Sequence, residues 1–491
     1  MSQDPALTRL AEAILLPPFP GTAAPGWVLG ALEQGLAGVA LFGSNVAGPE
    51  QLAALTAQLR AAADHPLIAI DEEGGDVTRL NHQTGSPYPG NAALGTVDDP
   101  ALTAAVYRAI GADLAAAGIN LDFAPTVDVN SADDNPVIGT RAFGSDPARV
   151  SNHTAAAVTG LQEAGIAACA KHFPGHGSTR EDSHRVVATV QGGIAALRPR
   201  DLPPFAAAIS AGTRAVMTGH LHVAGLTGAR PATLSHAALT GLLRGELGFE
   251  GVIVTDALEM RAVSGTYGIP DGAVLAVAAG ADLLCLGAAT GEQTYLAVRG
   301  AIAEAATGGS IPASRLEEAA ARVAGLRRWL VRRAGNGPAG ATGAGGRDGV
   351  GLVAARRAAR RTGPAEPLGD TLIVELQPPA NIAVGRVPWG IGRWAAGCEV
   401  LRVAAHDLVP DAVLGLAAGR RLVLVVRGAH RDPAAQAAVS ALVGARPDTA
   451  VVEMGLPVWR PPARTYVTTH GAGSANGQAA AELLGWCRTE P

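Results

Sequence analysis

The sequence predicts an α/β protein, a (β/α)8 TIM-like barrel followed by a smaller α/β sandwich domain. Three observations support this prediction. The chain has 491 residues, which is enough for two or three domains. Its larger N-terminal part alternates short apolar runs with Ala-rich helical stretches, and alternating β and α units form parallel sheets. A Gly/Ala-rich segment then precedes a second, shorter α/β series.

Eight apolar runs in the N-terminal part are strand candidates, because each is short and is bounded by turn-forming or polar residues. They cover residues 13–21, 37–45, 66–75, 119–128, 166–175, 214–222, 251–258 and 281–287. Helical segments such as 100–118 lie between them, and a helix over 315–335 ends the series. Eight consecutive β/α units predict a closed barrel.

The same pattern sets the expected domain boundaries. A catalytic barrel domain is expected over residues 1–335. Residues 336–351, NGPAGATGAGGRDGVG, lack hydrophobic periodicity and predict a linker. The runs TLIVEL, EVLRVA, RLVLVV, TAVVEMG and TYVTTHG then predict the sandwich domain over residues 352–491.

Composition argues against several classes of function. The net charge is −5 and no basic run occurs, so no nucleic-acid partner is expected. The N-terminus lacks a signal-peptide pattern and the apolar runs stay below the ~18 residues of a membrane span, so no membrane partner is expected. The four cysteines, Cys169, Cys285, Cys398 and Cys487, lie far apart, so we expect free thiols in a reducing compartment, the cytoplasm. They form no metal-binding pair, and no metal or cofactor is expected.

Charged side chains follow several of the predicted strands. In a barrel the loops after the strands meet at one end, where the chemistry takes place. The residues expected there are Asp71, Arg79, Asp128, Arg141, Lys171, His172, His220 and Asp256. Asp256 follows the apolar run GVIVT, and an ionised carboxylate held there beside a cation can attack an electrophilic carbon. The alternative is that Asp256 only caps a helix beginning at ALEM.

The segment KHFPGHGSTREDSH, residues 171–184, concentrates unusual residues. Lys171 is the only lysine in the chain, so 37 of its 38 basic residues are arginine. A single retained lysine predicts a position that needs a compact ammonium and not a planar guanidinium. Pro174 and two glycines prevent a helix here, so His172 and His176 do not form a helical metal-binding pair.

The end of this segment, Asp182-Ser183-His184, predicts a proton-transfer pair on a loop over the barrel mouth. The carboxylate is close enough to hold one imidazole nitrogen, which orients the ring and favours its protonated form. The other nitrogen then remains to deliver a proton. The alternative is a solvent-exposed pair without a role.

Five segments, taken in order, carry a family resemblance: IAIDEEGGDVTRL, INLDFAPTVDVN, VIGTRAFGSD, KHFPGHGSTREDSH and LLRGELGFEGVIVTDALEM. They resemble the β-N-acetylglucosaminidase branch of glycoside hydrolase family 3 over most of residues 10–330. The C-terminal part is similar, less specifically, to the α/β sandwich that follows the barrel in longer members.

The resemblance implies a retaining exo-β-N-acetylglucosaminidase that removes terminal GlcNAc from peptidoglycan fragments or chitooligosaccharides. Asp256 would be the nucleophile that forms a covalent glycosyl-enzyme, and His184 the acid/base with Asp182 as its partner. The substrate-binding residues implied are Asp71, Arg79, Arg141, Lys171, His172 and Asp128. One departure from the expected pattern is the pair of acidic residues Glu72 and Asp76, which would add negative charge near the sugar.

Several alternatives stay open from the sequence. A histidine acid/base does not repel an anionic acceptor, so a β-N-acetylglucosaminide phosphorylase is one of them. A β-glucosidase of the same family is another, although the Asp-Ser-His loop argues against it. A metal-dependent barrel hydrolase would use His172, His176, His184 and Asp182, and a non-enzymatic sugar-binding protein ranks last. The natural aglycone, the role of the C-terminal domain and the oligomeric state are not decided.

Overall fold

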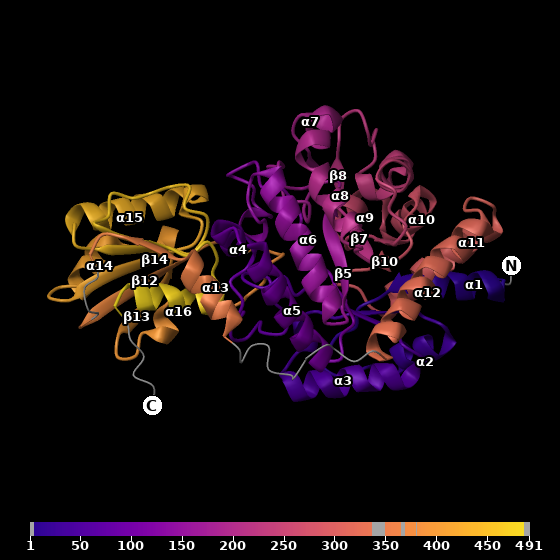
Figure 1. Cartoon of the computed structure of the whole chain (residues 1–491), viewed down its shortest axis with the longest axis horizontal. Helices are drawn as coiled ribbons and strands as arrows, with labels where there is room; N and C mark the ends of the chain where they lie inside the picture. Colours follow the sequence, from indigo (N-terminus) through magenta and orange to yellow (C-terminus); the bar gives the residue numbers. More distant parts are fainter. Residues whose placement is uncertain (1–3, 336–348, 365–368, 380, 486–491) are drawn as a thin grey trace. The chain divides into compact units, whose positions relative to one another are not determined.

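The computed structural model describes residues 4–335, 349–364, 369–379 and 381–485 (Figure 1). The described residues divide into two compact units. The first, called the barrel unit, lies within Met1–Glu72, Thr103–Ile138 and Ser145–Asp348. The second, called the sandwich unit, lies within Glu73–Leu102, Gly139–Gly144 and Gly349–Pro491.

Each of the eight predicted runs of the barrel unit contains a strand. The strands are β1 (Leu15–Leu16), β2 (Gly38–Ala40), β3 (Leu67–Ile70), β4 (Leu121–Asp122), β5 (Ala167–Phe173), β7 (Ala215–Thr218), β9 (Val252–Val254) and β10 (Leu284–Cys285). Six of them form a parallel sheet in the order β2-β3-β4-β5-β7-β9, and β1 pairs with β10 in parallel. The sheet closes because Ala40 N–H donates to Pro17 O at one edge and Val254 bridges to Leu283 at the other. The predicted fold class is therefore confirmed.

The barrel interior is filled with side chains, as the alternation of residues along a strand requires. One residue in two points inward on each strand, for example Ala215 and Met217 on β7. Leu326 and Trp329, from the last helix of the unit, join the same core. The packed interior leaves the ends of the strands as the places where polar side chains can gather.

Helices follow the strands and cover the outside of the barrel (Figure 1). They are α1 (Pro5–Glu12), α2 (Gly26–Gln34), α3 (Pro49–Ala62), α5 (Pro100–Ala116), α6 (Pro147–Glu163), α7 (Gly193–Arg200), α8 (Leu202–Ser210), α9 (Arg261–Tyr267), α10 (Ile269–Ala279), α11 (Glu292–Thr307) and α12 (Ala313–Gly335). A helical segment with π-type hydrogen bonds, Ala237–Glu246, precedes β9. Two short strands, β6 (Ala188–Thr189) and β8 (Leu221–His222), pair with each other outside the barrel sheet. Asp146 caps α6 by accepting from Ala148 N and Arg149 N, the usual role of Asp at a helix start.

The sandwich unit has a six-stranded sheet of its own, in the order β11-β16-β15-β14-β12-β13. The strands are β11 (Arg360–Thr362), β12 (Thr371–Gln377), β13 (Glu399–Ala404), β14 (Arg421–Val426), β15 (Ala450–Glu453) and β16 (Thr465–Thr468). Only β11, the strand that the sequence did not predict, is antiparallel to its neighbour. Its three residues, Arg-Arg-Thr, are exposed, so they lack the apolar pattern that marks the other strands.

Helices cover both faces of this sheet, as expected of parallel strands that are apolar on both sides. Leu372 and Val374 of β12 belong to a core with α14 (Pro410–Leu416) and α15 (Pro433–Ala445). Ile373, on the opposite face, belongs to a second core with α16 (Ser474–Leu483) (Figure 1).

Segments that come from loops of the barrel sequence also belong to the sandwich unit. Residues 73–102 include α4 (Asn91–Val97), which packs against α13 (Val350–Ala358). Gly351 of α13 lies so close to Pro87 that a Cβ atom would stand 2.1 Å from the Pro87 carbonyl oxygen. The units thus cut across the boundaries expected from the sequence, and residues 336–348 of the expected linker lie outside the described residues.

Two further expectations concern the chain as a whole. Cys169, Cys285 and Cys398 are free thiols, the first two buried, and Cys487 lies outside the described residues. In the part of the chain that the structure describes, no helix is long and apolar enough to cross a membrane.

Candidate active site

Six of the eight residues expected at the barrel mouth lie in the barrel unit, at or beyond the carboxyl ends of its strands: Asp71, Asp128, Lys171, His172, His220 and Asp256. Asp71 follows β3, Lys171 and His172 are the fifth and sixth residues of β5, and Asp256 follows β9. Because all these strands are parallel, their carboxyl ends form one rim of the barrel. The strand pattern therefore brings together residues that are up to 185 positions apart in the sequence.

Lys171 forms a buried ion pair. Its Nζ lies 2.6 Å from Asp71 Oδ1, and only 2% of the lysine side chain is exposed. An ammonium on an extended four-carbon stem reaches this position inside the barrel, whereas a planar guanidinium needs more room and more acceptors. The geometry gives a physical reason for the one lysine in a chain that otherwise uses arginine.

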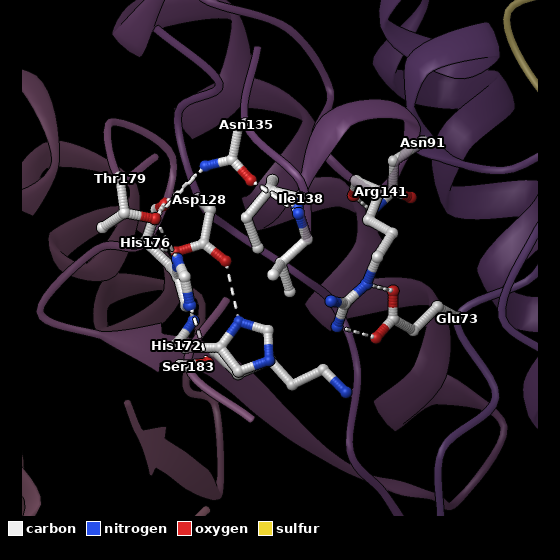
Figure 2. Close-up of polar contacts among 12 residues, drawn as sticks. Glu73, Asn91, Asp128, Asn135, Ile138, Arg141, His172, His176, Thr179 and Ser183 are labelled. Carbon is white, nitrogen blue, oxygen red and sulfur yellow. Dashed lines mark hydrogen bonds and ion pairs between the residues drawn. The ribbon is translucent and has the colours of Figure 1, made fainter. Parts of the chain in front are cut away.

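Asp128 is the fixed centre of a hydrogen-bond cluster (Figure 2). Its Oδ2 lies 2.8 Å from His172 Nδ1, and its Oδ1 accepts from the backbone N–H groups of His176 (2.6 Å) and His172 (3.3 Å). Since a carboxylate only accepts, His172 Nδ1 carries the proton. Asp128 is buried, so it orients His172 and is a positioning residue in this structure.

His176 is buried and joins the two halves of the loop (Figure 2). Its Nδ1 lies 2.6 Å from Thr179 Oγ1 and its Nε2 lies 2.9 Å from Ser183 Oγ. Thr179 donates its own hydroxyl proton to the His176 carbonyl, so His176 Nδ1–H donates to Thr179 and Nε2 accepts from Ser183. The sequence placed His176 only in the metal-binding alternative, as one of its ligands.

The start of this loop is held from the other side. Asn135 donates to the His176 carbonyl at 2.9 Å and accepts from Val137 N and Ile138 N (Figure 2). Gly177 is required where the loop crosses the segment after Asp128, because a Cβ atom there would lie 1.9 Å from the Val129 carbonyl oxygen. The loop therefore leaves β5 along a fixed path.

His184 and Asp182 form the pair that the sequence predicts. His184 Nδ1 lies 2.7 Å from Asp182 Oδ1, and His184 N–H donates to the same oxygen at 3.0 Å. Burial alone would raise the pKa of Asp182, but the bonds from His184 and the charge of Arg185 hold it below its ordinary value. Asp182 therefore stays ionised and keeps a proton on His184 Nδ1. The other ring nitrogen, Nε2, is then the one that can exchange a proton with a bound molecule.

The loop carrying this pair returns to the segment after β9. Arg261 N–H, at the start of α9, donates to the His184 carbonyl at 3.3 Å. The His184 side chain is 20% exposed, in contrast to the buried His172 and His176. A partly exposed imidazole near Asp256 can exchange protons with a bound molecule.

Asp256 is an ionised carboxylate among histidines. Burial by itself would raise its pKa, but His220, His172, His184 and a bond from Ala257 N–H (2.8 Å) together hold the pKa below the ordinary value. The next helix, α9, begins at Arg261, with Met260 as the residue before it. The capping alternative is therefore wrong, and Asp256 is available for chemistry.

His220 closes a hydrogen-bond chain around Asp256. Its Nε2–H donates to the Ala257 carbonyl (2.9 Å), and its Nδ1 lies 2.8 Å from Thr233 Oγ1. Thr218 Oγ1 lies 2.8 Å from the same hydroxyl and 3.4 Å from Asp256 N. Burial lowers the pKa of His220, and its two contacts fix the backbone on both sides of the carboxylate. The sequence places His220 at the barrel mouth but assigns it no role there.

Arg79 and Arg141 belong to the sandwich unit. Arg141 is buried and donates two hydrogen bonds to Glu73, at 2.9 and 2.7 Å, while its carbonyl accepts from Asn91 (Figure 2). Arg79 Nη2 donates to the Ala383 carbonyl at 3.0 Å. Glu73, which the sequence analysis missed, orients the Arg141 guanidinium.

The acidic departure at Glu72 and Asp76 has another explanation. Asp76 is buried, accepts from Thr140 and Ala472 N, and lies 3.2 Å from Arg427 Nη2. The expectation that Asp76 adds uncompensated negative charge is therefore wrong, because Arg427 from the C-terminal sheet neutralises it. Glu72 is also buried, and its N–H donates to Asp122.

The metal-binding alternative required His172, His176, His184 and Asp182 to converge. Instead each histidine has its own oxygen partner, and no group of three or more His, Cys, Asp or Glu within the described ranges is placed to hold a metal ion.

These features define the class of the protein: a (β/α)8 barrel with carboxylates and histidines gathered at the carboxyl ends of its strands, followed by a second α/β unit. Comparison with known proteins narrows this class. The family model for the glycosyl hydrolase family 3 N-terminal domain matches residues 31–326. The chain therefore belongs to glycosyl hydrolase family 3, which confirms the predicted family and the predicted class of enzyme.

Individual relatives carry more specific names. Beta-hexosaminidase A of Pseudoalteromonas piscicida is 38% identical over 269 residues, which are 50% of this chain and 45% of that protein. Beta-hexosaminidase LpqI of Mycobacterium tuberculosis is 37% identical over 53% of this chain and 67% of that protein. The chain thus spans less than half of the first of these relatives.

A solved structure resembles both units. The family 3 β-N-acetylglucosaminidase from Paenibacillus sp. FPU-7 has a TM-score of 0.86 and is 32% identical, over 98% of this chain and 96% of that one. The two-unit architecture is therefore shared with a relative over nearly the whole length.

Proposed function

We propose that the protein is a retaining exo-β-N-acetylglucosaminidase that removes terminal GlcNAc from peptidoglycan fragments or chitooligosaccharides. The observation that carries the proposal is the presence of an ionised Asp256 together with a partly exposed His184 whose Nδ1 is held by Asp182. The relatives named Beta-hexosaminidase and β-N-acetylglucosaminidase support the choice of sugar.

In the first step, Asp256 attacks the anomeric carbon and forms an ester bond to the sugar. The glycosidic C–O bond breaks, and imidazolium His184 gives its Nε2 proton to the leaving oxygen. Asp182 lowers the cost of the imidazolium by its charge and by its hydrogen bond to Nδ1.

In the second step, neutral His184 accepts a proton from water at Nε2. The water oxygen bonds to the anomeric carbon, the ester to Asp256 breaks, and the carboxylate and imidazolium are restored. Retaining glycosidases usually use a second carboxyl group for this proton transfer. Here we assign it to the imidazole because it has the exposure and the orientation that the step needs.

Asp71, Lys171 and His172 are proposed to bind the hydroxyl groups of the GlcNAc ring. Lys171 presents donors fixed by Asp71, and His172 is fixed by Asp128. The sugar-binding roles predicted for Arg79 and Arg141 stay predictions, as does the cytoplasmic location, which cell fractionation tests directly.

The proposal is tested with p-nitrophenyl β-N-acetylglucosaminide as substrate. Wild-type protein should release p-nitrophenol, and Asp256→Ala should lose about 10⁴-fold in turnover, since the nucleophile is removed. Adding azide to Asp256→Ala should restore some turnover and give the α-linked glycosyl azide, because the anion replaces the carboxylate. Turnover of the matching glucoside with none of the GlcNAc substrate would contradict the assignment and favour the β-glucosidase alternative.

A phosphorylase is the second candidate, favoured by one observation: the group that Asp182 orients is an imidazole, His184, and not a second carboxyl group. Phosphate, unlike water, is an anion that a carboxylate in this position would repel. If phosphate is the acceptor, GlcNAc 1-phosphate replaces GlcNAc as the product and turnover rises with phosphate concentration. Product analysis with and without phosphate decides between the two acceptors.

A further inference from the structure

The barrel unit contains a cavity of about 450 Å³ at the end opposite the candidate active site. It is lined by the residues that lead into β7 and β9, Thr213–Arg214 and Gly251–Val252, and by α12. The carboxyl ends of the same two strands carry His220 and Asp256. The volume falls within the roughly 300–1,000 Å³ of small-molecule sites.

The lining of this cavity is positively charged. Arg214, Arg322 and Arg332 contribute three guanidinium groups against the single carboxylate of Glu250. Arg322 is engaged by the buried Asp282, with Nη1 at 3.2 Å from Oδ1. The charges of Arg214 and Arg332 have no such acidic partner among the described residues.

Arg214 is held in an unsatisfied state. Its guanidinium carbon lies 4.9 Å from the centre of the Trp329 ring, and its Nε is buried without a hydrogen-bond partner. Burial, then the charges of Arg333 and Arg332, lower the pKa of Arg214. A buried donor left unpaired and cations held near one another both cost free energy, and a bound anion would reduce both costs.

We propose that this cavity binds the phosphate group of a small organic phosphate, at the forked donors of Arg214 and Arg332. Guanidinium groups bind phosphate through paired, charge-assisted hydrogen bonds, and a phosphate monoester carries about −1.5 to −2 charges at neutral pH. That charge matches the two unpaired arginines better than one carboxylate does. The cavity leaves room for the sugar-sized part of such a molecule beside its phosphate.

The site is tested by isothermal titration calorimetry of the full-length protein at physiological ionic strength, with glucose 6-phosphate as the probe. Saturable binding is expected, and Arg214→Met and Arg332→Met should each weaken it about tenfold or more, because each removes a charge-assisted bond. Arg332 is exposed, so its substitution leaves folding intact even if Arg214→Met does not fold.

Two variants and two further ligands serve as controls. Arg328→Met removes an exposed charge from the same helix α12 outside the cavity, and Asp256→Ala alters only the opposite end of the barrel; both should bind as the wild type does. Glucose should not bind here. Inorganic phosphate that binds as tightly as glucose 6-phosphate would support the anion site and assign it to the free ion. Absence of saturable binding by both phosphates, or binding unchanged in Arg332→Met, would overturn the proposal.

Discussion

The segment from Lys171 to His184 holds its histidines in two different ways. In the first half, His172 and His176 are buried, and both are bound by the buried Asp128 on another loop of the barrel. In the second half, the His184 side chain is 20% exposed and is held by Asp182, two residues earlier in the same loop. The first arrangement fixes the position of the histidines. The second fixes the orientation of the His184 ring and leaves its Nε2 accessible.

This difference matches what the two groups are proposed to do. A sugar-binding group gains from rigidity, because any freedom must be lost when the substrate binds. A proton-transfer group must reach the leaving oxygen and then the acceptor, so it needs access and a fixed tautomer. Substitutions in the first half should therefore reduce mainly the stability of the protein, and substitutions in the second half should reduce mainly its turnover.

The largest effect is expected from Asp128→Ala, in the rigid half. It leaves the imidazole of His172 and two backbone N–H groups without their acceptor, so the free energy of unfolding should fall by about 3–5 kcal/mol. Turnover should fall with it, because His172 loses its orientation. Urea unfolding of the full chain, with Asp134→Ala as an exposed control, measures the difference. A variant as stable as the wild type would show that Asp128 does not anchor this half.

His184→Ala should reduce turnover by about 10³-fold with a much smaller change in stability than Asp128→Ala, because the side chain is partly exposed and serves proton transfer. The loss in the glycosylation step should be greater for chitobiose than for p-nitrophenyl β-N-acetylglucosaminide, since p-nitrophenolate leaves without protonation. Single-turnover measurements compare the two substrates, and His236→Ala, an exposed histidine elsewhere, is the control. Equal losses on both substrates would argue against His184 as the acid.

Asp182→Asn should cost about 10- to 100-fold in kcat with KM little changed, because the amide keeps the shape but loses the charge that supports the imidazolium. The pKa of Asp182 is lowered in the folded protein. Its contribution to stability is therefore present above the unfolded pKa, near 4, and is lost as the pH falls below it. Wild type and variant should therefore become equally stable in acid. Thermal unfolding between about pH 3 and pH 7, a range around the ordinary pKa of Asp, would show this. A fall in KM alone would contradict the assigned role.

The smallest effect is expected at Asp201, which packs behind the rigid half: a Cβ atom on Gly175 would stand 2.5 Å from the Asp201 Cβ. Burial raises the pKa of Asp201 to about 6, although Arg200 pairs with it. A raised pKa contributes stability that is complete below the unfolded pKa near 4 and is lost as the pH rises through about 6.

Asp201→Asn should therefore stabilise the protein by about 1–2 kcal/mol at pH 8 and have no effect near pH 4. Unfolding in urea at the two pH values measures this. Asp134→Asn, on the surface, should show no such dependence. A variant less stable than the wild type at pH 8 would mean that the ion pair of Asp201 with Arg200 stabilises the fold by more than the burial of the charge costs.

The fold was largely predictable because its signal is local. Each of the eight apolar runs became a strand of the barrel, and the five runs of the C-terminal part became five of the six strands of the second sheet. Burial of short apolar segments and the length of the connections decide this pattern, and both are visible in the sequence. The exposed β11, with Arg-Arg-Thr, has no such signal and was missed.

The candidate site was predictable to a lesser degree. Asp256, Lys171 and the Asp182–His184 pair stood out by their place after apolar runs or by their spacing. Glu73 and the contact of His220 did not, because their partners are far away in sequence: Glu73 meets Arg141 across 68 positions, and His220 meets the Ala257 carbonyl across 37.

By itself, the sequence determined the barrel, the strand ends that carry charge and the residues that can do chemistry. The tertiary structure decided which of them are held rigidly and which stay accessible, and it assigned Asp76 to a pair with Arg427. It also brought Arg214 to one cavity with Trp329 and Arg332 of α12, more than 100 positions away in the chain. The physical reason is that side-chain pKa, orientation and ion pairing depend on neighbours in space, and chain folding alone decides which neighbours meet.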